Sequence, residues 1–94
     1  MTRRRTIGAM PLFMIERRYA DQLEVDGDIV REVEAINAEE DVRWVVSFLT
    51  ADKLRSYCLY EASSPDAILA AARRAGLPAD VVTQVSEVDP AVLR

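Results

Sequence analysis

The stretch SPDAILAAARRAGLP, from Ser64 to Pro78, has the composition of one complete helix, including its start and its end. Ser64 is a natural N-cap, and Pro65 suits the first helical position, where its missing N–H costs nothing. Gly76 can adopt the left-handed conformation that ends a helix, and Pro78 prevents the helix from continuing. Alanines and larger aliphatic residues supply an apolar face of good helix formers. The sequence therefore predicts a helix over 65–75.

Segments on both sides of this helix have the composition of strands. Val42–Thr50 and Lys53–Glu61 are rich in β-branched and aromatic residues, so we expect two strands joined by a tight turn at Ala51-Asp52. After the helix, Asp80–Val88 alternates in the same manner and predicts a last strand that Pro90 ends.

The N-terminal part of the chain adds one strand and one helix. The apolar run Leu12–Ile15 is too short for a helix and favours a central strand. Beyond it, apolar residues recur at the spacing i, i+4, i+8 and i+11 of a helical stripe: Val25, Ile29, Val33 and Ile36. Asp26 or Asp28 can cap this helix, which we expect to end near Ala38.

The order β-α-β-β-α-β is that of the split βαβ motif of the ferredoxin-like fold. We therefore predict an α+β protein with a four-stranded antiparallel sheet and two helices on one face. A chain of 94 residues makes one domain. We place it at residues 10–90, with a flexible N-terminal extension at 1–9 and a C-terminal tail at 91–94.

The middle strands carry large apolar residues on both faces. Simple alternation places Trp44, Val46 and Phe48 on one face, and Val45 and Leu49 on the other. Because two helices cover only one face, the second face would leave more apolar surface exposed than a monomer tolerates. We expect two copies to pack these sheet faces together in a homodimer. The alternative is that the terminal segments cover that face.

Charge and composition argue against several classes of partner. The net charge is −4 and the basic run Arg3-Arg4-Arg5 is confined to the N-terminus, so we expect no nucleic-acid partner. No apolar run approaches the roughly 20 residues of a membrane-spanning helix, so we expect no membrane partner. The single cysteine, Cys58, cannot form an intrachain disulfide and agrees with a cytoplasmic location.

The chain contains no histidine, which excludes Ser-His and Cys-His nucleophile pairs and imidazole ligands or bases. Charged and aromatic side chains on the neighbouring first and third strands are the candidates for a ligand pocket: Glu16, Arg18, Arg55, Tyr57, Cys58, Tyr60 and Glu61. The alternative is that these charges form cross-strand ion pairs at an interface rim, and that Cys58 is a small core residue. The acidic run Glu39–Asp41 lacks the spacing of a calcium loop and is typical of a solvated surface.

Three segments resemble a known family: MPLFMIERRY (Met10–Tyr19), the stretch Val42–Asp80 and VSEV (Val85–Val88). The family is a small domain common in actinobacteria, long catalogued as a domain of unknown function and often labelled nickel-binding-protein-like. The resemblance implies a ferredoxin-like subunit, a homodimer and, in at least one branch, nickel binding. Nickel favours imidazole and thiolate ligands, and this chain has no imidazole and one thiol. No metal ligand is therefore carried over to it, and a metal site stays unknown.

Three functions are compatible with these features. The first is a non-catalytic accessory homodimer that holds a small ligand, or a weakly bound metal, between its sheets or in a cleft between sheet and helices. The second is a cofactor-free or oxygen-using enzyme of the dimeric α+β barrel type, acting on a small organic substrate. Its proton chemistry would fall to Tyr57, Tyr60, Glu16 and Arg18. The third is a structural or regulatory interaction module.

Overall fold

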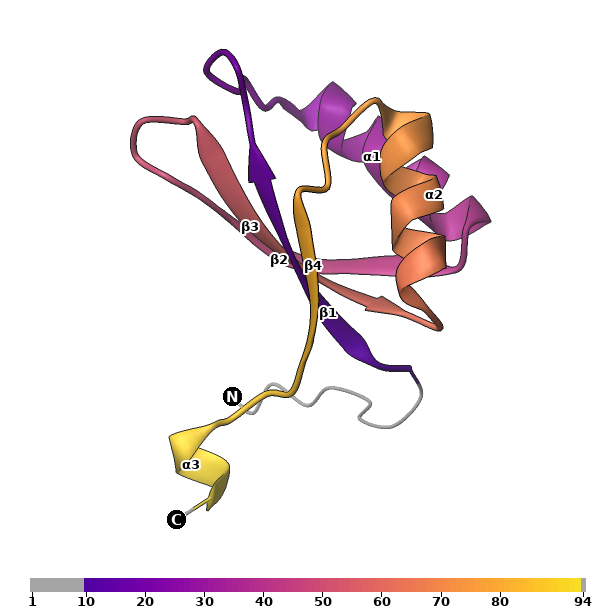
Figure 1. Cartoon of the computed structure of the whole chain (residues 1–94), viewed down its shortest axis with the longest axis vertical. Coiled ribbons are helices and arrows are strands. Elements are labelled where there is room, and N and C mark those ends of the chain that lie inside the picture. The colour runs from indigo at the N-terminus through magenta and orange to yellow at the C-terminus, as the bar shows by residue number, and fades with distance from the viewer. Residues whose placement is uncertain (1–9, 94) are drawn as a thin grey trace.

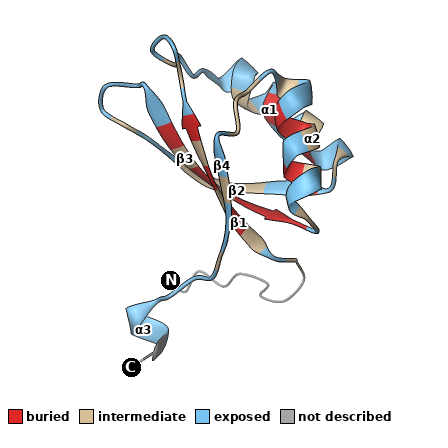
Figure 2. Ribbon diagram, in the orientation of Figure 1, coloured by how far each residue is buried: buried red, intermediate tan, exposed pale blue. Residues whose placement is uncertain are grey.

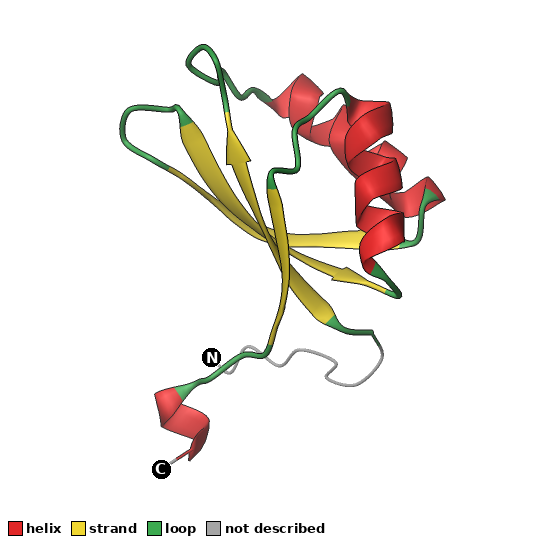
Figure 3. Ribbon diagram, viewed as in Figure 1, coloured by secondary structure: helices red, strands yellow, loops and turns green. Residues whose placement is uncertain are grey.

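The computed structural model describes residues 10–93, and the extension expected at residues 1–9 lies outside them. In chain order the elements are β1 (Leu12–Arg18), α1 (Gly27–Glu39), β2 (Val42–Leu49), β3 (Arg55–Ala62), α2 (Pro65–Ala75), β4 (Val81–Val85) and α3 (Pro90–Leu93). The predicted order of strands and helices is confirmed, and a short helix follows the last strand (Figure 3).

The four strands form one antiparallel sheet in the order β2-β3-β1-β4. Figure 1 shows α1 and α2 side by side on one face of this sheet, whereas α3 stands apart beyond the end of β4. This arrangement is the predicted α+β, ferredoxin-like fold. None of the helices between residues 10 and 93 is long and apolar enough to cross a membrane.

Helix α2 begins and ends where its sequence predicts. The Ser64 hydroxyl accepts a hydrogen bond from the backbone N–H of Ala67 at 3.3 Å. At the other end Gly76 has φ of 70°, in the left-handed region. The N–H of Leu77 donates to the carbonyl of Ala72 at 2.9 Å, and the N–H of Gly76 donates to the carbonyl of Arg73 at 3.2 Å. These two bonds are the pattern of a Schellman motif.

Helix α1 is capped by Asp26, whose carboxylate accepts from the backbone N–H of Ile29 at 2.9 Å. Its acidic C-terminal end is unfavourable next to the negative pole of the helix dipole. Arg74, in the last turn of α2, offsets this charge because it forms ion pairs with both Glu39 and Glu40. The two helices are thus joined at the end of α1 by opposite charges.

The hydrophobic core lies between the sheet and the two helices. Figure 2 shows buried residues in red along β1 and β3 and on the inner sides of α1 and α2. Phe13 and Ile15 come from β1, Cys58 and Tyr60 from β3, and Ile68 from α2. Cys58 is buried here as a small core residue.

Strand β2 contains an irregularity that simple alternation missed. Trp44 pairs with Tyr60, but Val46 pairs with Leu59, so Val45 is an extra residue in the ladder. This β-bulge shifts the residues after it to the other face. The expectation that Trp44, Val46 and Phe48 share one face was therefore wrong.

The connection between β2 and β3 is longer than the expected two-residue turn. The N–H of Thr50 donates to the carbonyl of Arg55 at 2.9 Å, so the loop spans residues 51–54. Lys53 has φ of 63° in this loop, and the Asp52 carboxylate accepts from the N–H of Leu54 at 3.0 Å. The third strand consequently begins at Arg55 and not at Lys53.

The last strand is shorter than predicted. It ends at Val85, which pairs with Leu12, the first residue of β1, so the ladder has no further partner beyond that pair. The tail expected from residue 91 is instead part of α3, whose first backbone groups are capped by Asp89: its carboxylate accepts from the N–H of Ala91 at 2.9 Å.

Candidate functional site

The sheet separates the ligand-binding residues proposed from the sequence into two groups. One group lies on the face without helices: Glu16, Arg18, Arg55, Tyr57 and Glu61. The other lies on the helix-covered face: Cys58 and Tyr60. Within the first group Arg18 pairs with Glu16 at 3.1 Å, and Glu61 pairs with Arg43 of β2. These ion pairs match the rim alternative more closely than a shared pocket.

We call the sheet face opposite α1 and α2 the open face. The ladder pairings bring a row of apolar side chains together on it: Met14, Val46, Phe48, Tyr57, Leu59 and Val81. Phe48 has 61% of its surface exposed and Val81 has 44%. No helix of the described chain covers this face (Figure 1). It is a candidate surface for a partner.

A cleft opens on the other side of the sheet, between α1 and strands β1 to β3. We call it the α1–sheet cleft, and its volume is about 350 Å³. Its helix side is apolar, formed by Val25, Ile29 and Val33. The stripe expected from Val25 starts too early, because the helix begins at Gly27 and Val25 precedes it. Within the helix Val33 is buried and Ile29 is 42% exposed, while Val25 is 51% exposed. The N-terminal half of the helical stripe thus forms a wall of the cleft.

Aromatic rings form the sheet side of this cleft. The rings of Trp44 and Tyr60 stack with their centroids 6.4 Å apart. The indole N–H of Trp44 donates to the Ser47 hydroxyl at 2.7 Å. The β-bulge at Val45 makes this bond possible, because it brings Ser47 to the same face as Trp44.

Two backbone hydrogen bonds fix the outer end of the cleft. The N–H of Tyr19 donates to the carbonyl of Leu54, and the N–H of Leu23 donates to the carbonyl of Lys53, both at 2.9 Å. They tie the loop between β1 and α1 to the hairpin loop. Leu23 and Tyr19 are held in this way where they line the cleft.

Arg17 is the charged residue of the cleft, and the sequence analysis did not select it. Its exposed fraction is only 3%. Its Nε donates to the carbonyl of Pro78 at 2.7 Å, and its guanidinium carbon lies 5.5 Å from the ring centroid of Tyr60. Alternation along β1 could have identified it, because Arg17 follows Phe13 and Ile15 on the face that packs against the helices.

The two phenols near Arg17 keep their protons at neutral pH. Burial raises the pKa of Tyr60, against the opposing effect of the Arg17 charge. Burial also raises the pKa of Tyr19, whose hydroxyl shares a 2.6 Å hydrogen bond with Ser56. Burial alone would lower the pKa of Arg17, but Tyr60 and Cys58 outweigh that effect and raise it. The site therefore presents a permanent cation between two neutral phenols.

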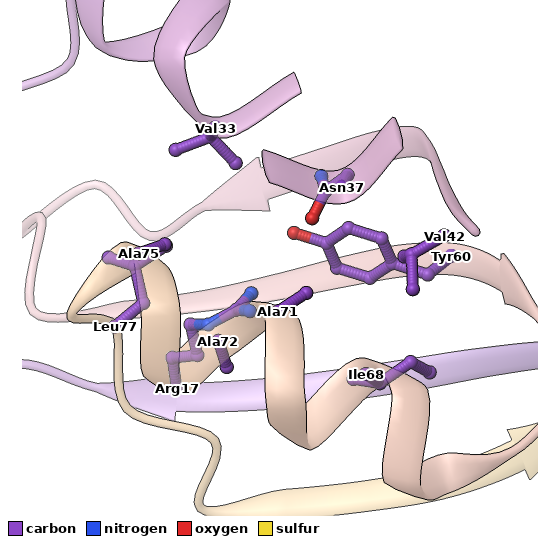
Figure 4. Close-up of a pocket in the computed structure, with 10 residues that line it drawn as sticks. All are labelled: Arg17, Val33, Asn37, Val42, Tyr60, Ile68, Ala71, Ala72, Ala75 and Leu77. Carbon is purple, nitrogen blue, oxygen red and sulfur yellow. The ribbon is translucent and has the colours of Figure 1, made fainter. Parts of the chain in front are cut away.

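A second, smaller cavity lies deeper, between both helices and the sheet (Figure 4). Its volume is about 10 Å³, and Arg17, Tyr60 and Asn37 contribute its polar lining. The Nδ2 of Asn37 is buried without a hydrogen-bond partner among the described residues.

Comparison with known proteins places this geometry in a family. The model of the nickel responsive protein SCO4226-like family matches residues 13–85, which span the sheet and both long helices. The chain belongs to the SCO4226-like family.

A solved structure shares the fold of this SCO4226-like chain. The crystal structure of SCO4226 from Streptomyces coelicolor A3(2) is 24% identical in sequence and gives a TM-score of 0.72. The match covers 83% of this chain and 99% of that one. Among curated proteins, none matches the chain significantly.

The description of the SCO4226-like family raises the question of whether this member's donor groups suit nickel. Nickel sites favour imidazole and thiolate ligands. The chain has no histidine, and Cys58 is buried in the core. Within residues 10–93 no group of three or more potential ligand side chains could hold a metal ion. The donor set of this SCO4226-like chain therefore does not fit a nickel ion.

Proposed function

We propose that this chain is a non-catalytic accessory protein that holds a small, largely apolar molecule in the α1–sheet cleft, as one half of a homodimer. The observation that supports this most is the cleft itself. Its volume of about 350 Å³ lies within the range of small-molecule sites. Its lining also has their usual composition, mostly apolar with a few polar groups.

The exposed walls of the cleft supply a driving force for binding. Val25 just before α1, Ile29 on α1 and Leu49 on β2 line the cleft, and all three are more than one-third exposed. A ligand that removed these side chains from water would gain about 25 cal/mol for each Å² of apolar surface buried. The ring of Trp44 is part-exposed and stacks on the buried ring of Tyr60, so it offers a flat surface for the same ligand.

The groups in the cleft favour binding over catalysis. Tyr19 and Tyr60 have raised pKa values, so neither is poised to accept a proton at neutral pH. No aspartate or glutamate lines the cleft among the described residues. For these reasons we do not extend the proposal to the enzyme alternative.

The homodimer is supported by the open face. Its apolar row extends over all four strands, and Phe48 is 61% exposed. A second copy is the partner that would match this face with an equally apolar one. We also propose a cytoplasmic location, where the thiol of Cys58 would stay reduced.

The test of ligand binding uses a neutral fluorescent probe, N-phenylnaphthylamine, titrated into untagged protein. We expect its fluorescence to rise with saturation in the wild type. The variant Ile29→Trp should weaken binding at least about tenfold, because a larger side chain would fill the cleft from a wall that is already part-exposed. Its matched control is Leu69→Trp, at a position on α2 that is 39% exposed and does not line the cleft.

Two results would contradict the proposal. One is the absence of saturable probe binding to folded wild-type protein. The other is equal binding to the wild type and to Ile29→Trp, which would place the probe elsewhere, for example on the open face.

A further inference from the structure

Arg17 is a buried cation without an anionic partner. It is 3% exposed, and it forms no ion pair with any residue between 10 and 93. Arginine is almost never fully buried unless it is paired, because its charge loses the stabilisation of water. The nearby carboxylates on β1 and β3, Glu16 and Glu61, project from the open face and pair there with Arg18 and Arg43. The sheet itself lies between them and Arg17.

The partners that Arg17 does have are neutral and too few for its donors. A guanidinium has five N–H donors. The carbonyl of Pro78 takes the Nε–H at 2.7 Å, and the phenol of Tyr60 lies beside the guanidinium. With the Pro78 carbonyl and the Tyr60 phenol each taking one bond, three N–H groups have no acceptor among the described residues. These groups are not sealed off, because Asn37 Nδ2 is the one fully buried side-chain nitrogen or oxygen without a partner among those residues. Figure 4 shows the nitrogen end of Arg17 directed toward the Tyr60 phenol.

The surroundings of Arg17 suit an anionic head group. Arg17 lines the α1–sheet cleft and lies directly opposite Ser56 on β3. The hydroxyls of Ser56 and Tyr19 share one hydrogen bond, so one of their two protons is free to donate. A carboxylate or sulfonate against Arg17 would thus meet a planar fork of N–H groups and a neutral hydroxyl donor.

From this geometry we infer that the ligand of the α1–sheet cleft is an organic monoanion, with an aromatic or alicyclic body and one carboxylate-like group bound by Arg17. The body stacks on Trp44, whose ring is part-exposed, and contacts the apolar wall of the cleft at Ile29. The anionic group of the ligand is the counter-charge for Arg17, which has no ion-pair partner among residues 10–93. This inference rests on the proposed function and adds the chemical class of the ligand.

The experiment compares two probes that share one scaffold: anilinonaphthalene sulfonate, an anion, and N-phenylnaphthylamine, its neutral parent. For the wild type we expect the sulfonate to bind at least about tenfold more tightly. Arg17→Met should remove this preference, so that the two probes bind this variant with affinities within a factor of about two of each other. Arg17→Lys should keep part of the preference, because it retains the charge but loses the planar fork. Arg55→Met, on the open face, is the control and should keep all of it.

A second measurement removes the dependence on a folded Arg17 variant. In the wild type, naphthoate and naphthamide compete with the neutral probe, and they differ in one group, an anionic carboxylate in the first and a neutral carboxamide of similar size in the second. Tighter competition by naphthoate supports the inference, and equal competition overturns it while leaving the proposed function standing. If neither probe binds in a manner sensitive to Ile29→Trp, the proposed function fails and the inference fails with it.

Discussion

Asn37 is a buried polar residue of α1 with an incomplete set of hydrogen bonds. It is 5% exposed, and its Nδ2 has no partner in the described chain. The adjoining cavity of about 10 Å³ is at the lower limit for one water molecule. An unpaired buried amide costs about 1–3 kcal/mol. The side chain of Asn37 thus lowers the free energy of unfolding locally.

We predict that Asn37→Ala raises the free energy of unfolding by about 1 kcal/mol. The substitution removes the unsatisfied donor and introduces a better helix former, against a small cavity penalty. Urea denaturation followed by circular dichroism measures the change. Glu34→Ala, at an exposed position of the same helix, is the control and should change stability by less than about 0.5 kcal/mol. A loss of stability in Asn37→Ala would mean that a bound water or ligand satisfies the amide.

Neighbouring residues of β1 point to opposite faces of the sheet, and this decides which of its charged residues lies in the cleft. Glu16 and Arg18 drew attention as charges at a strand end, but they face away from the helices and pair with each other. Arg17 between them shares the face of Phe13 and Ile15. Its role depends on what lies above that face, namely Tyr60 and the Pro78 carbonyl. Those contacts are long-range, so the strand sequence alone could not supply them.

Helix α2 shows which features an element can encode locally. Its cap, its first-turn proline and its left-handed end involve residues within a few positions of one another. No atom lies within 4 Å of a Cβ placed on Gly76, so the backbone conformation alone restricts that position. Both ends can therefore be tested without disturbing the core.

We predict that Ser64→Ala lowers the free energy of unfolding by about 1 kcal/mol, because the N–H of Ala67 loses its acceptor. Gly76→Ala should cost about 1–2 kcal/mol, since alanine is strained at a φ of 70°. Chemical denaturation of each variant gives these values. Ser63→Ala, exposed and adjacent, is the control. A cost for Ser63→Ala equal to that for Ser64→Ala would argue against the cap.

The conformation of β2, in contrast, depends on residues far away in the sequence. Whether Val45 is an extra residue depends on how Trp44 and Val46 pair with β3, and no local pattern specifies that pairing. The hairpin loop differs from expectation for a similar reason, because Asp52 stabilises a longer turn through bonds to Leu54 and Thr50. The lining of the α1–sheet cleft depends on the bulge in β2. Ser47 and Leu49 line it only because the bulge moved them to the helix side.

The molecule as a whole leaves apolar surface on two sides. On one side the α1–sheet cleft is lined by part-exposed aliphatic residues. On the other side lies the open face, where Phe48 is 61% exposed. Beyond the end of β4, Val88 and Val92 of the C-terminal segment are 70% and 73% exposed. Small domains bury a limited share of their surface, and association with a second copy adds to it. A dimer through the open face would leave the cleft of each subunit free for its ligand, because α1 lies on the opposite side of the sheet.

The last prediction concerns this association. Native mass spectrometry of untagged wild-type protein should give the mass of a dimer. Phe48→Asp should weaken the dimer at least about tenfold, since it places a charge within the apolar contact. Leu69→Asp changes an exposed leucine on the opposite, helical side and should leave the dimer intact. Probe binding in the cleft should survive in Phe48→Asp, because Phe48 does not line it. A wild-type monomer at the concentrations where the protein stays folded would contradict the dimer, and a loss of probe binding in Phe48→Asp would contradict the independence of the two surfaces.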